Sequence, residues 1–260
     1  MAYQHKAKSS FGRICASQSY YLLFYINEPS IIIGRSQNTL EEINHDYVEN
    51  NIHIVRRISG GGAVYHDYGN LNFSFITNRD VTSLNNFKKF TEPIINALSK
   101  IGVEVELKGR NDILVNDKKI SGTAQFSTGK RMISHGTLLF DTDLGKVANA
   151  LQVKMSKIVS KGHKSVRSHV ANISEFIDRP LKIEDFRALL LSGLYEEKES
   201  FETYHLTRDE WKAVHSLKEE KYDSWDWNYG RSPKFNIQRT KRFTLGEIDV
   251  RMFVEVSHRT

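Results

Sequence analysis

The stretch Val55–Phe75, V-R-R-I-S-G-G-G-A-V-Y-H-D-Y-G-N-L-N-F-S-F, is the part of this chain that decides its fold. Two arginines and a serine precede three consecutive glycines, and a run with alternating apolar residues follows them. Adjacent glycines cost conformational entropy on folding, but their backbone can lie tight against a ligand. Arg56 and Arg57 add fixed charge and planar donors that suit phosphate or carboxylate. The pattern predicts an anion-binding turn between two strands; a glycine-rich hairpin with its arginines in solvent is the alternative.

Short apolar runs bounded by turn residues predict strands on both sides of this turn. Before it they cover 20–26, 30–33 and 52–56, and after it Leu71, Phe73 and Phe75 share one face of another strand. Further strands are expected at 103–107, 112–115, 119–124, 132–140, 235–237 and 243–250, and helices at 87–98, 143–151, 184–197 and 207–217. Residues 116–118 form a hairpin turn in this interpretation, and Pro93 either kinks its helix or marks the true start, with Thr91 as cap.

The order of these elements lacks a regular βαβ alternation, and no internal repeat or low-complexity linker interrupts it. It therefore predicts the α+β class, with a mixed, mainly antiparallel sheet and flanking helices. A chain of 260 residues is long enough for one large domain.

The amino-acid composition of the chain limits the classes of function that it can have. The 37 basic residues exceed the 31 acidic ones by six, an excess that suits anionic small ligands or an acidic protein partner. The basic runs are short and scattered, so nucleic-acid binding is not expected. The single cysteine, Cys15, excludes a disulfide framework and a cysteine-based zinc site. With no run of membrane-span length and no apolar signal core, the sequence predicts a cytoplasmic protein that binds no membrane.

A second informative block is Gly109–Gln125, G-R-N-D-I-L-V-N-D-K-K-I-S-G-T-A-Q. Lys119 stands here on a predicted strand close to a glycine, where a lysine could contact both a carboxylate and a phosphate. A hairpin-edge lysine that discourages edge pairing is the alternative. Asp112 could orient Lys119, help to place Mg²⁺, or only cap the turn after Arg110. His66 and His135 invite a general-base role, but a histidine in such a position is more often structural.

Together the two blocks resemble the lipoate-protein ligase A family of the biotin/lipoate ligase superfamily. The family patterns are R-R-x-S-G-G-G-A-V-[FY]-H-D-x-G-N, followed by G-R-N-D, a variable turn and K-[IVF]-S-G. Three further stretches agree: His135–Phe140 (H-G-T-L-L-F), Lys161–Ile173 (K-G-H-K-S-V-R-S-H-V-A-N-I) and Ser224–Gly230 (S-W-D-W-N-Y-G). The resemblance covers residues 20–250 and implies a biotin/lipoyl ligase-like catalytic domain over that range.

The resemblance implies ATP-dependent ligation of lipoate to a lysine of an acceptor lipoyl domain through a lipoyl-adenylate. It makes Lys119 the catalytic residue, in contact with the lipoate carboxylate and the α-phosphate. The nucleotide would bind to Arg57, Lys119 and the positions Gly62, Ala63, Val64 and Tyr65; Ser59 and Asp112 would bind substrate. The apolar end of lipoate needs a slot, for which Val64, Leu71, Phe73 and Phe75 are candidates that could equally be core.

The implied cofactors are ATP and Mg²⁺. The implied partners are the lipoyl domains of 2-oxoacid dehydrogenase complexes or the glycine cleavage H protein, and a separate accessory-domain protein.

Both ends depart from the family pattern. Residues 1–19 lack the expected N-L-A-x-E-E-type helix, and residues 251–260 diverge where a small accessory domain usually follows. We interpret the chain as a short form with atypical termini, and expect it to transfer lipoate from supplied lipoyl-adenylate better than it makes the adenylate. The alternatives are an octanoyl or lipoyl transferase of the same fold and a truncated, non-catalytic lipoate- or adenylate-binding protein. Cys15 lies outside the matched blocks, which argues against a thioester route.

Overall fold

The structure is a computed structural model that describes residues 14–17, 20–44, 46–48, 52–151, 169–194, 202–232, 237–244 and 246–253. Most of the family block at 161–173 lies outside these residues, as do 1–13 and 254–260.

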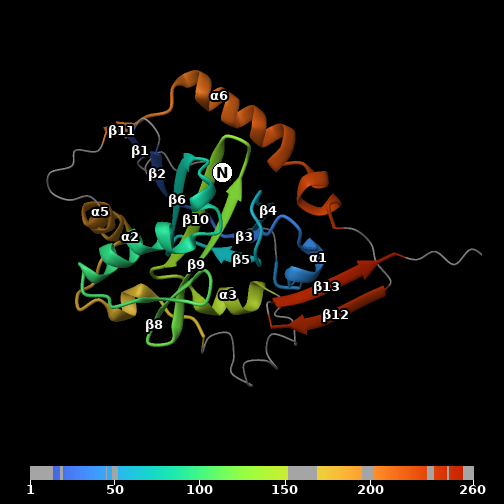
Figure 1. The fold of residues 1–260 in the computed structure, drawn as a ribbon, viewed down its shortest axis with the longest axis horizontal. Helices are drawn as coiled ribbons and strands as arrows, with labels where there is room; N and C mark the ends of the chain where they lie inside the picture. The colour runs from blue at the N-terminus through green and yellow to red at the C-terminus, as the bar shows by residue number, and fades with distance from the viewer. Residues whose placement is uncertain are drawn as a thin grey trace, which may run out of the picture.

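Strands between residues 14 and 139, joined by the later strand β11 (Glu202–Tyr204), build a large antiparallel sheet, which runs diagonally through the molecule in Figure 1. Each strand pairs antiparallel with its neighbour. From edge to edge the sheet contains eight strands: β11 (Glu202–Tyr204), β1 (Ile14–Ser17), β2 (Tyr20–Ile26), β6 (Asn70–Asn78), β10 (Arg131–Leu139), β9 (Lys118–Ser127), β8 (Asp112–Val115) and β7 (Glu106–Lys108).

A smaller sheet carries the glycine turn. Its central strand β3 (Ser30–Ile33) runs parallel to β4 (His53–Arg56) and antiparallel to β5 (Val64–His66). The three isoleucines of β3 are buried, and Ile31 and Ile33 pack in one cluster with Ala150 of α3 (Leu144–Ala150). A separate hairpin joins β12 (Ile237–Phe243) to β13 (Gly246–Met252). The prediction of an α+β fold with a mixed, mainly antiparallel sheet is confirmed.

The main core lies between one face of the large sheet and two helices, α2 (Phe87–Ser99) and α5 (Ile183–Leu194). Leu71 and Phe73 of β6 point to this side, where they meet Ile94 and Leu98 of α2 at zero exposure. Alternation along each strand sends every second residue to the opposite face, which neither α2 nor α5 covers (the helix-free face). The short elements α1 (Thr39–Glu42), η1 (Val81–Ser83) and η3 (Ile173–Phe176) complete the connections.

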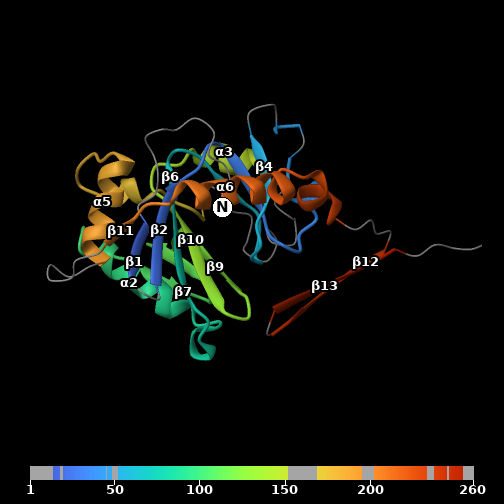
Figure 2. The same cartoon turned by 90° about the horizontal axis from the view of Figure 1, so that it is seen from above.

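The C-terminal third is the most extended part of the described chain. Helix α6 (Arg208–Leu217) continues through two π-helical turns, η4 (Lys218–Tyr222) and η5 (Asp226–Gly230), and crosses over the sheet in Figure 2. No residue of α6 is buried, and a capping box between Thr207 and Glu210 begins the helix. No helix among the described residues combines the length and the apolar character needed to cross a membrane.

Several local expectations need correction. Helix α2 begins at Phe87, where the Asn86 side chain accepts from Lys89 N, and it runs through Pro93, so a true start at Pro93 with Thr91 as cap is wrong. The strand expected at 103–107 is shifted to Glu106–Lys108. The polar stretch 238–242 was not predicted as strand because it lacks apolar alternation, yet it pairs with β13. Strands β1 and β11 were also not predicted; β1 extends the sheet to before residue 20.

Candidate functional site

The glycine turn joins β4 to β5 and is organised by the side chain of Arg57. The guanidinium donates to the carbonyls of Gly60 (2.6 Å) and Gly62 (2.8 Å) through Nη2, and to Ile32 O (3.0 Å) through Nη1. Gly61 has φ +92°, a conformation that suits glycine. Burial lowers the pKa of Arg57 to about 10, so the side chain stays charged at neutral pH. The Arg57 side chain therefore holds the two ends of the turn together through the carbonyls of Gly60 and Gly62 and leaves the outer side of the turn open.

The outer side of the turn presents backbone donors. Gly60, Gly61 and Gly62 are exposed, and none of their N–H groups donates to an acceptor within the described residues. Successive free N–H groups beside a fixed positive charge form a concave site for an anion. Tyr65 is 3% exposed, and burial raises its pKa to about 12, so only its backbone could face a ligand on this side.

Ser59 ties the turn to the large sheet. Its Oγ lies 2.6 Å from Nε2 of His135 on β10 and accepts from Arg57 Nε at 3.1 Å. Because Arg57 donates to Ser59, the serine proton can be donated to His135. Burial lowers the pKa of His135 to about 3, and the charge of Arg57 acts in the same direction. His135 is thus a neutral acceptor that holds Ser59 beneath the turn.

His66 is the second buried histidine near Arg57. Asn27 Nδ2 donates to its Nδ1 at 2.9 Å, which leaves the ring proton on Nε2. That nitrogen is buried without a partner within the described residues. Burial again lowers the pKa to about 3. Neither histidine is a cationic acid at neutral pH, which agrees with the structural role that the sequence favoured.

Lys119 lies on β9 with its Nζ 2.7 Å from Asp112 Oδ1 of β8. Both side chains are about one third to two fifths exposed, at 34% for Asp112 and 41% for Lys119. The backbone of Lys119 is held on its other side, because its N donates to His169 O (2.8 Å) and its O accepts from Ala171 N (3.1 Å). The block at 169–171 therefore fixes the strand that carries the lysine.

The register of the sheet places this ion pair on the same face as His135. His135 pairs with Ala124, and Asp112 pairs with Gly122, two residues before Ala124 on β9. A Cβ on Gly122 would lie 3.0 Å from Lys119 Nζ, so the ammonium lies above that glycine. An irregularity in the β8–β9 register re-aims Lys119 toward this face, as β-bulges do.

The helix-free face of the sheet thus brings together Lys119, Asp112 and His135, while Ser59 and Arg57 approach it from the small sheet. Leu71 and Phe73 belong to the core beside α2 and α5, and Phe75 packs against it, so the structure supports the alternative that these residues are core. Sequence reasoning also placed Arg56 at the anion site, but this residue is completely buried and donates to backbone carbonyls. No group of three or more potential metal ligands occurs within the described residues.

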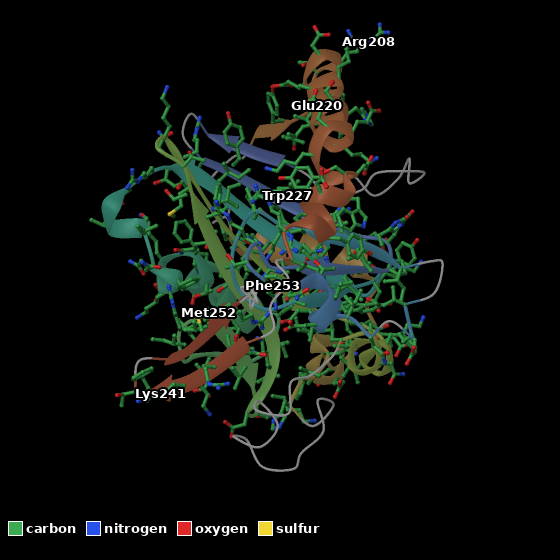
Figure 3. The ribbon with its side chains drawn as sticks, turned by 90° about the vertical axis from the view of Figure 1, so that its right-hand side faces the viewer. Arg208, Glu220, Trp227, Lys241, Met252 and Phe253 are labelled. Atoms are coloured by element: carbon green, nitrogen blue, oxygen red, sulfur yellow. The ribbon has the colours of Figure 1, made fainter. Side chains whose placement is uncertain are left out.

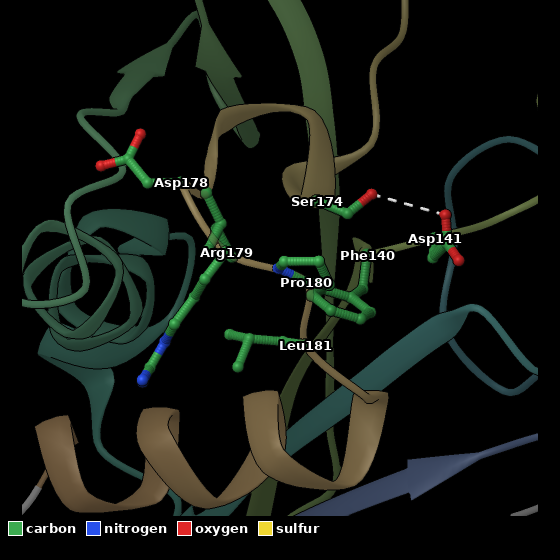
Figure 4. Close-up of a pocket in the computed structure, with 8 residues that line it drawn as sticks. Phe140, Asp141, Ser174, Asp178, Arg179, Pro180 and Leu181 are labelled. Carbon is green, nitrogen blue, oxygen red and sulfur yellow. Dashed lines mark hydrogen bonds between the residues drawn. The ribbon is translucent and has the colours of Figure 1, made fainter.

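A cavity elsewhere does not coincide with this site. It has a volume of about 340 Å³ and lies at the end of β10, where Ser174 Oγ is 3.4 Å from Asp141 Oδ1 (Figure 4). Its walls come from Phe140, Asp141, Ser174, Arg179, Pro180 and Leu181. None of the residues predicted to bind nucleotide or substrate lines it.

Comparison with known proteins identifies the family. The model of the lipoyl protein ligase A/B catalytic domain matches residues 3–195. Lipoate-protein ligase LplJ of Bacillus subtilis (strain 168) is 57% identical over 241 residues, which are 92% of this chain and 73% of that protein. The chain belongs to the lipoate-protein ligase family.

Solved structures of this ligase family share the fold. The bi-partite lipoate protein ligase of Thermoplasma acidophilum, from a study that includes its E2 lipoyl domain, aligns with a TM-score of 0.72 and 33% identity, covering 84% of this chain and 87% of its own. A lipoate-protein ligase A bound with ATP aligns with a TM-score of 0.69 and 32% identity, covering 82% and 86%.

Proposed function

We propose that this member of the lipoate-protein ligase family activates lipoate with ATP and transfers it to a lysine of an acceptor lipoyl domain. One observation carries the proposal: an exposed glycine turn with free N–H groups approaches the sheet face on which Lys119 lies. A ligase of 57% identity and an ATP-bound structure of the same family support it.

In the first step a carboxylate oxygen of lipoate attacks the α-phosphorus of ATP, and pyrophosphate leaves. The N–H groups of the turn, with Gly62, Ala63, Val64 and Tyr65 as backbone contacts, hold the phosphates. Lys119 carries a positive charge to the place where negative charge accumulates between carboxylate and phosphate. Arg57 acts mainly as the organiser of the turn, since its donors are already used on the carbonyls there.

In the second step the ε-amine of the acceptor lysine attacks the carbonyl carbon of the lipoyl-adenylate, and AMP leaves. The work of the protein in both steps is positioning and charge stabilisation. Ser59 holds the turn against the sheet through His135, and we assign it to binding the acid substrate.

Mg²⁺ fits this arrangement. It needs only one or two protein carboxylates when phosphate oxygens supply further ligands, and Asp112 is the carboxylate of the site. When bound, the ion would neutralise phosphate charge. Asp112 also orients Lys119. We therefore assign Asp112 to the binding of both the substrate and the metal ion.

The acceptors we propose are the lipoyl domains of 2-oxoacid dehydrogenase complexes or the glycine cleavage H protein. An E2 lipoyl domain belongs to the archaeal system whose ligase aligns with this chain. We place the reaction in the cytoplasm, because a single cysteine excludes a disulfide framework.

The test is pyrophosphate release from ATP, with and without lipoate, followed by mass spectrometry of a supplied lipoyl domain. Lipoate-dependent release and a modified acceptor are expected. Acyl transfer from an octanoylated carrier without ATP would instead favour the transferase, and binding without pyrophosphate release would favour a non-catalytic protein. Measuring adenylation and transfer separately compares the two steps.

A further inference from the structure

Arg56 is a fully buried arginine beside the nucleotide-binding turn, and the proposed mechanism does not use it. Its Nη1 donates to the carbonyls of Gly34 (3.0 Å), Arg35 (3.2 Å) and Gln37 (2.6 Å), which form the loop after β3. A buried guanidinium is stable only when its donors are satisfied, so these carbonyls are held in place by the charge they surround. Burial and the nearby charge of Arg231 lower the pKa of Arg56.

The 34–37 loop in turn supports the glycine turn directly. Gly34 packs so close that a Cβ there would lie 2.0 Å from Gly61 O. Arg35 N donates to Ser59 O at 2.9 Å, and Arg57 N donates to Ile33 O at 2.9 Å. These contacts are between backbone atoms that are already in close contact. A shift of the 34–37 loop must therefore move the glycine turn as well.

The other side of Arg56 is held by a segment that lies 171 residues away in the chain. Trp227 O accepts from Arg56 Nε (2.9 Å), and Trp227 Nε1 donates to Arg56 O (2.7 Å). Asn228 Oδ1 accepts from Arg56 N (2.8 Å), and Asn228 O accepts from Arg56 Nη2 (3.1 Å). Trp227 and Asn228 are both buried on η5, at the lower end of the segment that descends from Arg208 past Glu220 in Figure 3.

We propose that Trp227 and Asn228 are positioning residues for the nucleotide-binding turn, acting through Arg56 and the 34–37 loop. This inference rests on the proposed function, because it assigns the turn to ATP. Its physical basis is a continuous path of short hydrogen bonds and backbone contacts from η5 to Gly61 and Ser59. Arg56 is completely buried, so a shift of Trp227, Asn228 or the 34–37 loop would leave one of its donors or its carbonyl without a partner.

The experiment measures ATP affinity by calorimetry and the KM for ATP in lipoate-dependent pyrophosphate release. Trp227→Phe replaces the indole by a smaller aromatic ring and removes the N–H donated to Arg56 O, and Asn228→Ala removes the acceptor for Arg56 N–H. We expect each variant to bind ATP about tenfold more weakly, with kcat at saturating ATP within about twofold of the unaltered protein. Asn228→Asp keeps that acceptor but loses the Nδ2–H that Asn228 donates to Tyr222 O at 2.7 Å, so its melting temperature should fall while its ATP affinity in the folded protein stays within about twofold of the unaltered protein.

The matched control is Trp225→Phe. Trp225 lies in the same segment, is 68% exposed and stacks on Tyr229 rather than on Arg56. The ATP affinity of the Trp225→Phe variant should equal that of the unaltered protein. Melting temperatures are recorded for all variants, because a purely structural role would lower them without changing ATP affinity in the folded protein. Asn228→Ala decides the matter if Trp227→Phe is unfolded at the assay temperature.

The outcomes separate this inference from the proposed function. If the unaltered chain binds ATP and Asn228→Ala binds it equally well, the positioning role is overturned while the ligase assignment stands. If the unaltered chain neither binds ATP nor releases pyrophosphate, the ligase assignment fails, and the inference fails with it.

Discussion

Arg56 and Arg57 are adjacent in the chain, but their side chains lie in different surroundings and have different roles. Arg56 ends β4 with its side chain buried among carbonyls, whereas Arg57 turns toward the glycine loop and closes it. Successive residues of a strand point to opposite sides, which is why neighbouring arginines reach different surroundings. At the scale of single residues, the chemistry of the site therefore depends on direction as much as on residue type.

Replacing Lys119 by alanine should lower the rate of lipoate adenylation about a hundredfold or more, because the charge next to the attacking carboxylate is lost. The fold should persist, since the side chain is 41% exposed. Single-turnover pyrophosphate release is the measurement, with Lys118→Ala as the neighbouring control. Adenylation at a near-normal rate in Lys119→Ala would rule out the role assigned to this lysine.

The two central glycines of the turn should respond differently to valine. Both variants should lose ATP binding, because a side chain would occupy the phosphate site. Gly61→Val should also destabilise the fold by roughly 1–3 kcal/mol, because its φ of +92° is strained for a β-branched residue and its Cβ would lie 3.0 Å from Arg57 Nη2.

Gly62→Val has open space around its Cβ and should melt like the unaltered protein. Calorimetry and thermal melting separate the two effects. Unchanged ATP affinity in folded Gly62→Val would mean that the turn has only a structural role.

At the scale of elements, the β8–β9 hairpin determines where the Lys119 side chain lies. Asn116 and Asp117 both have positive φ, at 45° and 61°, as the two central residues of a type I′ turn require. The register shift that follows turns Lys119 to the helix-free face, over Gly122. The hairpin, and not the lysine alone, is therefore the functional unit.

Gly122→Ala tests this unit. The new methyl group would lie 3.0 Å from Lys119 Nζ and 3.1 Å from Cε, so the flexible end of the lysine must move away from Asp112. We expect about a tenfold loss of adenylation rate, because a misplaced charge stabilises the transition state less. The melting temperature should change little. Gly129→Ala, at a turn where nothing lies within 4 Å of the added Cβ, is the control; equal rates in both variants would contradict the prediction.

For the whole molecule, the two buried histidines link stability to pH. Their pKa values of about 3 in the fold lie well below the ordinary 6.5, because burial favours the neutral form. Between these values the unfolded chain binds more protons than the native one, so the free energy of unfolding rises with pH. The stability that depends on neutral histidines is complete above pH 6.5 and is lost as the pH falls toward 3.

Replacing His135 by glutamine should therefore flatten the pH dependence of stability. Each histidine contributes at most about 1.4 kcal/mol per pH unit across this window. Urea unfolding at several pH values between 6.5 and 3 should give a smaller slope for His135→Gln than for the unaltered protein. His215→Gln, on the exposed side of α6, is the control. Identical slopes in all three proteins would show that His135 does not titrate differently in the fold.

Local patterns in the sequence were sufficient for the strand alternation, the glycine turn, the hairpin at 116–118 and the proximity of Lys119 to Asp112. In each case the interacting groups are neighbours along the chain, so turn chemistry and residue period determine the result. The five ordered blocks likewise identified the family, which the comparisons confirm.

Only the tertiary structure decided which face of each strand meets the helices, and it placed Leu71 and Phe73 in the core and Phe75 against it, where the sequence had left a ligand slot and the core open. It also brought Ser59 to His135, 76 residues apart, and Arg56 to Trp227, 171 residues apart. The edge strand β11 pairs with β1 across a similar distance in the chain. The reason is physical: burial of an arginine or a histidine depends on the carbonyls and strands packed around it, and those come from parts of the chain that local periodicity does not relate.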